Sequence, residues 1–107
     1  MAFNLANFAP MGNTSKKVRG VGSTSIYGAP TMYTYISSDI MTGASGITSA
    51  GYFNSLVNTL SVGDLIYAVG GAGSGGTLAC RLLYVNANNG TTVDVVDGST
   101  IATTDTY

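Results

Sequence analysis

Histidine, glutamate and tryptophan are absent from this chain of 107 residues, and charge is scarce, with four basic and five acidic side chains. Enzymes depend on groups that titrate near neutrality or can be tuned to do so. The scarcity of such groups argues against catalysis. We therefore expect a structural or binding protein with no cofactor and no catalytic residue.

Cysteine is almost absent too, because Cys80 stands alone and no disulfide can form within the chain. Its apolar neighbours Ala79 and Leu82 predict a small buried side chain in a strand. A reactive thiol needs a nearby histidine or a cluster of positive charge. The adjacent cation, Arg81, falls on the opposite face of a strand, so we interpret Cys80 as structural.

The chain also lacks a long apolar run. No segment approaches the roughly 20 residues of a membrane span, so no membrane partner is expected. Residues 1–8 are interrupted by Asn4 and Asn7, and the basic residues follow this stretch instead of preceding it. This order predicts no cleaved signal peptide and synthesis in the cytoplasm.

The few charges are unevenly distributed. Residues 1–30 hold three basic residues and no acidic one, whereas residues 31–107 hold one basic residue and all five aspartates. This division predicts an extended arm over residues 1–30 and a compact β domain over residues 31–107. The cations of the arm are Lys16, Lys17 and Arg19. Three charges without interleaved aromatic residues attract nucleic acid only weakly, so the expected partner is an acidic protein surface and not nucleic acid.

The arm has no regular hydrophobic period and is punctuated by glycine and proline. Its apolar residues Phe3, Leu5 and Phe8 are predicted anchors for the groove of a partner protein. The alternative is that they fold back over the open face of the chain's own sheet. Tyr27 lies outside any predicted strand and joins the candidate partner contacts. We expect the domain of residues 31–107 to fold without the arm.

Residues 31–107 show the short apolar, β-branched and aromatic runs of a β-sheet. We predict strands at residues 32–36, 65–69, 77–85 and 91–96, a short helix within 52–60, and a last strand or tail from 99 to 107. Asn88, Asn89 and Gly90 favour a tight type I′ hairpin turn. Because the connections are short and no long helix is available for a crossover, we expect antiparallel pairing. The predicted fold is mainly β, a small antiparallel β-sandwich or barrel-like sheet with one short helix and an extended N-terminal arm.

Residues 71–76 read GAGSGG and match the dinucleotide-binding pattern G-x-G-x-x-G. That motif needs a helix whose N-terminus binds the pyrophosphate, whereas a β-patterned run follows here, so a hairpin loop is the better interpretation. Asp94 and Asp97 near one turn, and Asp64 elsewhere, do not have the spacing of a calcium loop. We interpret them as solvated turn residues and expect no metal site.

Tyrosine, in contrast, is abundant, with seven residues. A stacking surface for carbohydrate or nucleic acid is one interpretation. Tyr35, Tyr67 and Tyr84, however, lie in apolar strand patterns, where the ring packs and the hydroxyl stays at the rim. We therefore expect them in the core or at a subunit interface.

Six short segments follow one another in an order that resembles small virion proteins of tailed bacteriophages. They read MAFNLA (residues 1–6), MYTY (32–35), GYFN (51–54), VGDLI (62–66), YVN (84–86) and VDV (93–95). The proteins that carry similar segments are capsid decoration, or cement, proteins and head-fibre components. The chain departs from that pattern by the long segment of residues 9–30.

The resemblance implies a β body on the outer capsid surface and an arm that binds major capsid proteins and bridges them. It lends the chain no catalytic residue. We expect synthesis in the bacterial host and a homo-oligomer, with a trimer ranked before a dimer. The predicted capsid contacts are Phe3, Leu5, Phe8, Lys16, Lys17, Arg19 and Tyr27. The alternative function is the base of a head or tail fibre, an adhesin that contacts host glycans.

Overall fold

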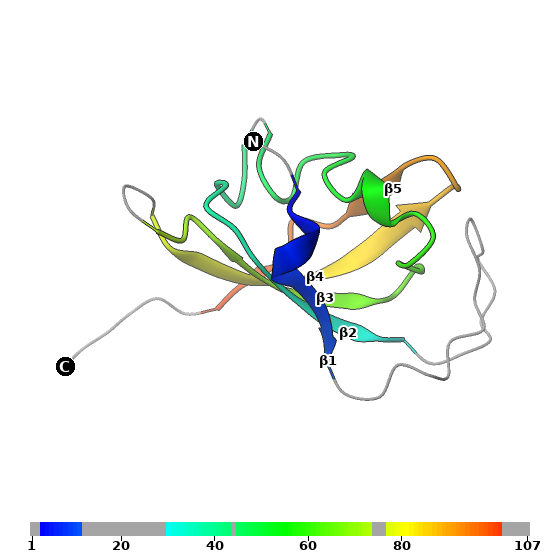
Figure 1. Cartoon of the computed structure of the whole chain (residues 1–107), viewed down its shortest axis with the longest axis horizontal. Coiled ribbons are helices and arrows are strands. Elements are labelled where there is room, and N and C mark those ends of the chain that lie inside the picture. The colour runs from blue at the N-terminus through cyan, green and yellow to red at the C-terminus, as the bar shows by residue number, and fades with distance from the viewer. Residues whose placement is uncertain (1–2, 12–29, 44, 74–76, 102–107) are drawn as a thin grey trace.

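The computed structural model describes residues 3–11, 30–43, 45–73 and 77–101, and within them the chain is mainly β, as predicted. The elements of this part are, in chain order, the 3-10 turn η1 Leu5–Asn7, β1 Phe8–Met11, β2 Met32–Ile36, the 3-10 turn η2 Asn54–Leu56, β3 Leu65–Gly70, β4 Ala79–Asn88, β5 Val93–Val95 and β6 Ser99–Thr100. The strands form one sheet in the order β1-β2-β3-β4-β5, and β6 pairs with β4 (Figure 1).

The sheet is mixed, because β2 and β3 run parallel, with Met32 opposite Leu65 and Ile36 opposite Val69. The predicted antiparallel pairing is wrong for this pair and correct for the other pairs of strands. A parallel pair requires a crossover of a dozen or more residues. Residues 37–64 supply that length with loops and η2. The prediction assumed that a parallel crossover requires a long helix, and this crossover is made without one.

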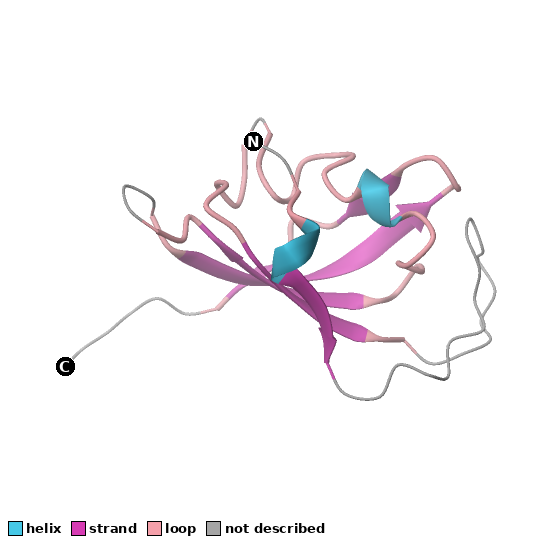
Figure 2. Cartoon of the chain, viewed as in Figure 1, coloured by secondary structure: helices cyan, strands magenta, loops and turns pink. Residues whose placement is uncertain are grey.

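The crossover covers one face of the sheet, which we call the inner face (Figure 2). Inner-face side chains of the central strands, such as Tyr35, Ile66 and Leu83, are buried there. The crossover residues that complete this core are Met41, Ile47, Phe53, Leu56 and Leu60. Met41 and Ile47 lie in the loop that follows β2, so this loop contributes to the core.

The helix predicted within residues 52–60 exists as the 3-10 turn η2 with further turns on either side. A side chain from the sheet holds this segment in place. The Nδ2 atom of Asn88 in β4 donates to the carbonyl oxygens of Val57 at 2.9 Å and Leu60 at 2.7 Å. These bonds satisfy carbonyl groups that a single helical turn leaves without partners.

The first described residues of the predicted arm pack on the domain. Phe3 stacks on Tyr35 with ring centroids 5.1 Å apart, and Phe8 in β1 stacks on Tyr33 at 4.9 Å. The alternative given for Phe3 and Phe8, that they fold over the chain's own sheet, is therefore the arrangement observed. Residues 12–29 of the arm lie outside the described residues.

The hairpin predicted around Asn89 joins β4 and β5, but the predicted type I′ turn is wrong. Within its loop, residues 89–92, only Gly90 has a positive φ, of 89°. A type I′ turn needs positive φ at both central residues. The Asn89 side chain shapes this loop instead, since its Oδ1 accepts from the backbone N–H groups of Thr91 at 2.9 Å and Thr92 at 2.8 Å.

Candidate functional site

The second face of the sheet, which we call the outer face, carries no charged side chain among the described residues. Residues directly opposite one another on paired strands share a face, so the cross-strand register defines its members. They are Ala9, Met11, Met32, Thr34, Ile36, Leu65, Tyr67, Val69, Cys80, Leu82, Tyr84 and Ser99. The outer face is therefore a continuous surface of apolar and hydroxyl side chains.

Several large apolar side chains of the outer face are open to solvent. Tyr84 is 50% exposed, and Met11 and Ile36 are each 46% exposed. Figure 2 shows both 3-10 turns and the crossover on the other side of the sheet. Contiguous exposed apolar patches of this kind mark interaction sites. The outer face is the strongest candidate for a functional surface.

Cys80 and Tyr67 are neighbours on the outer face, since Tyr67 lies two residues from Val69, the cross-strand partner of Cys80. A hydrogen bond with the thiol raises the pKa of Tyr67. Cys80 is half-buried, so its predicted place in the core is wrong. The register places it on the outer face, and Arg81 faces the opposite side, as expected.

A chain of hydrogen bonds links the N-terminal segment to the crossover. The N–H of Asn4 donates to the Tyr35 hydroxyl at 3.0 Å. The Tyr35 hydroxyl lies 2.8 Å from that of Tyr52, which donates to Oδ2 of Asp39 at 2.5 Å. Burial and the hydrogen bond to Asp39 raise the pKa of Tyr52. A phenol held protonated in this way is a poor base, so the cluster fits a structural role.

Asp64 is fully buried, and its interpretation as a solvated turn residue is therefore wrong. Its carboxylate accepts from the N–H of Thr31 at 3.0 Å and from the N–H of Ser61 at 2.9 Å. A buried carboxylate is tolerated only when such donors replace water. Asp97, in contrast, is exposed as predicted.

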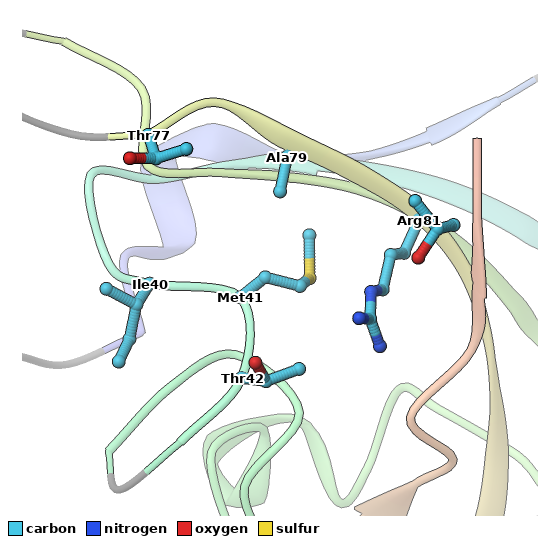
Figure 3. A pocket seen from close by; sticks show the side chains of 7 residues that line it. Ile40, Met41, Thr42, Thr77, Ala79 and Arg81 are labelled. Carbon is cyan, nitrogen blue, oxygen red and sulfur yellow. The ribbon is translucent and has the colours of Figure 1, made fainter. Parts of the chain in front are cut away.

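An open pocket of about 420 Å³ lies at one end of the inner face, between the start of the crossover and β4. Its lining residues are Ile40, Met41, Thr42, Thr77, Ala79, Arg81 and Thr100. Figure 3 shows the side chains of Met41 and Arg81 pointing into it. The Nη1 of Arg81 donates to the carbonyl oxygen of Asp97 at 2.8 Å. The described residues that line this pocket include no carboxylate and no thiol, and Arg81 is already bonded to Asp97.

The glycine-rich segment of residues 71–76, of which residues 74–76 lie outside the described part, comes between the antiparallel strands β3 and β4, as the interpretation as a hairpin loop requires. A strand and not a helix follows it, so no helix N-terminus is present there to bind a pyrophosphate.

The predicted capsid contacts have different surroundings. Phe3 and Phe8 are partly buried against the chain's own core, whereas Leu5 on η1 is 65% exposed. The other predicted contacts lie outside the described residues, and they are Lys16, Lys17, Arg19 and Tyr27.

The outer face was not predicted as a surface, although the sequence of β3 carries a signal for it. The run Leu65–Gly70 contains no charged residue and no alternation of apolar with polar positions. A strand with one solvated face normally shows such alternation. The uninterrupted apolar run therefore marked both faces of the sheet as apolar.

Within residues 3–11, 30–43, 45–73 and 77–101, no three histidine, cysteine or acidic side chains are grouped so that they could hold a metal ion. In the same residues no helix has the length and apolar character to cross a membrane. The sequence matches no protein-family model, no curated protein and no solved structure.

Proposed function

We propose that the chain is a structural protein of a tailed-phage virion that binds the outer surface of the capsid and stabilises it by bridging major capsid proteins. The observation that carries the proposal is the distribution of charge, because residues 1–30 hold three basic residues and no acidic one in a chain that lacks histidine and glutamate. Such a basic segment is suited to bind the acidic surface of a partner protein. A protein that binds only the assembled shell adds its binding free energy to the stability of that shell.

The proposed contacts with an acidic capsid surface are the basic residues of the N-terminal region, Lys16, Lys17 and Arg19. Leu5, which is 65% exposed, is an apolar side chain of this region that can contact a partner. Phe3 and Phe8 support the contact indirectly, because their packing on the sheet fixes the position of Leu5 between them. Salt screens the attraction between opposite charges, so this contact should weaken as ionic strength rises.

Cosedimentation with mature capsids of the encoding phage, prepared without the protein, tests the proposal. We expect saturable binding by the wild type, and binding weaker by about tenfold or more for the triple variant Lys16→Ala/Lys17→Ala/Arg19→Ala. Arg81→Ala, which removes a cation from the domain, is the matched control and should bind as the wild type does.

Absence of saturable binding to the capsids would overturn the proposal. Tyrosine-dependent binding on a glycan array, without capsid binding, would instead favour the base of a head or tail fibre that contacts host glycans.

A further inference from the structure

We propose that the outer face is the surface through which two copies of the chain pair, face to face, as a two-fold symmetric dimer. The inference does not rest on the proposed virion role, because it concerns the chain alone and its test needs no capsid.

The first support comes from β3, which is apolar on both sides. Ile66 and Ala68 are buried on the inner face, whereas Leu65, Tyr67 and Val69 on the outer face are partly exposed. A continuous apolar run is the pattern of a strand covered on both faces. The crossover covers only the inner face. The composition of β3 therefore predicts a second layer over the outer face, and the described residues do not form such a layer.

The lack of charge favours a second copy as that layer. Around a two-fold axis a surface meets itself, so a charged side chain near the axis would face its own like charge. The outer face avoids this conflict throughout the described residues. Its polar atoms include the hydroxyls of Thr34, Tyr67 and Ser99, which can donate as well as accept and can therefore pair with their own kind. A partner with a charged surface would find no counter-charge here.

The size of the outer face suits a modest dimer. Five strands, β1, β2, β3, β4 and β6, contribute to it, and a strand spacing of about 4.8 Å makes it about 20 Å wide. With its largest apolar side chains about half exposed, the face offers on the order of 600 Å² of accessible surface, somewhat less than the roughly 800 Å² per partner of a standard interface. Such a dimer should dissociate at micromolar concentrations.

Sedimentation velocity over a concentration series tests the dimer. We expect the mass to rise from that of the 10.9 kDa chain to twice that value. Leu82→Lys places a charge between Tyr67 and Ser99 in the cross-strand order and should weaken the dimer by about tenfold or more. Thr34→Lys should have the same effect, and it replaces a side chain that is already polar and partly exposed. Asn58→Lys, at an exposed crossover position, is the matched control and should dimerise as the wild type does.

Three outcomes would overturn the dimer. The first is a wild type that stays monomeric to high micromolar concentration. The second is that Thr34→Lys and Asn58→Lys dimerise equally well while circular dichroism shows that both variants are folded. This comparison tests the dimer even if Leu82→Lys fails to fold. The third is a monomer in which Tyr67 and Tyr84 resist nitration, since the chain's own remaining residues would then cover the face.

Discussion

Asp64 Oδ1 accepts a hydrogen bond of 3.0 Å from the backbone N–H of Thr31, although the two residues are 33 positions apart in the chain. Thr31 precedes β2 and Asp64 precedes β3, and the N–H of Leu65 donates to the Thr31 carbonyl oxygen at 3.0 Å. A hairpin turn sets the register of neighbouring strands in an antiparallel pair, but this parallel pair has no such turn. The carboxylate of Asp64 aligns the starts of the two strands instead.

Replacement of Asp64 with alanine leaves the N–H groups of Thr31 and Ser61 buried without their acceptor. We expect the free energy of unfolding to fall by about 3 kcal/mol, measured by urea denaturation. Asp97→Ala, at an exposed position, is the control and should change this free energy by less than about 0.5 kcal/mol. Similar losses for the two variants would contradict the role assigned to Asp64.

The hydroxyl of Thr31 is buried and has no hydrogen-bond partner among the described residues. Thr31→Val removes this hydroxyl and keeps the branched shape of the side chain. Because the desolvated hydroxyl gains nothing in the folded state, we expect the free energy of unfolding to rise by about 1 kcal/mol. Urea denaturation of the wild type and the variant measures this difference. A clear loss of stability in Thr31→Val would show that the hydroxyl has a favourable contact.

Phe8→Ala tests whether the N-terminal segment belongs to the core. The Phe8 ring stacks on Tyr33 but is only partly buried. We therefore expect the free energy of unfolding to fall by about 2 kcal/mol, which is less than the usual loss when a fully buried phenylalanine is replaced by alanine. Leu5→Ala, which truncates an exposed side chain three residues earlier in the chain, should change the free energy of unfolding by less than about 0.5 kcal/mol. If Phe8→Ala proves as harmless as Leu5→Ala, the segment is an arm that serves a partner only.

Alkaline pH should destabilise the fold through Tyr52. Desolvation and the hydrogen bond to Asp39 raise its pKa above the ordinary value of 10.0, so the folded state holds this proton more tightly than the unfolded state does. The resulting stability is fully present below pH 10 and is lost as the pH rises above it. In an ultraviolet titration of tyrosinate, Tyr52 should ionise only as the protein unfolds.

Tyr52→Phe is the control for that titration. It should remove one ionisation from the unfolding step and leave the rest of the titration curve unchanged. Reversible ionisation of Tyr52 in the folded protein would contradict the burial and hydrogen bonding described here.

Gly71 and Gly73 form a matched pair, since both have a positive φ, of 66° and 94°. A Cβ atom on Gly71 would collide with the carbonyl oxygen of Thr77, whereas a Cβ on Gly73 meets no atom of the described residues within 4 Å. We expect Gly71→Ala to lower the free energy of unfolding by more than about 3 kcal/mol, and Gly73→Ala by about 1 kcal/mol from backbone strain alone. Equal losses would mean that the loop moves freely away from Thr77.

The strands were predictable from the sequence because they depend on local pattern. Met32–Ile36 and Leu65–Gly70 are short apolar and aromatic runs bounded by turn residues, and the structure has strands at both places. The glycine-rich loop after the second run was predictable for the same reason. The sequence by itself therefore determined the mainly β class and the positions of the central strands.

Only the tertiary structure decided which strands pair, on which face of the sheet each side chain lies and how exposed it is, because these properties depend on contacts between distant residues. Nothing local to β2 or β3 specifies that they run parallel, since Asp64 and Thr31 meet only after the crossover has formed. Nor does residue type alone reveal whether Phe8 serves a partner or packs on Tyr33. Finally, both sides of the sheet are apolar, and only the path of the crossover decides which of them it covers.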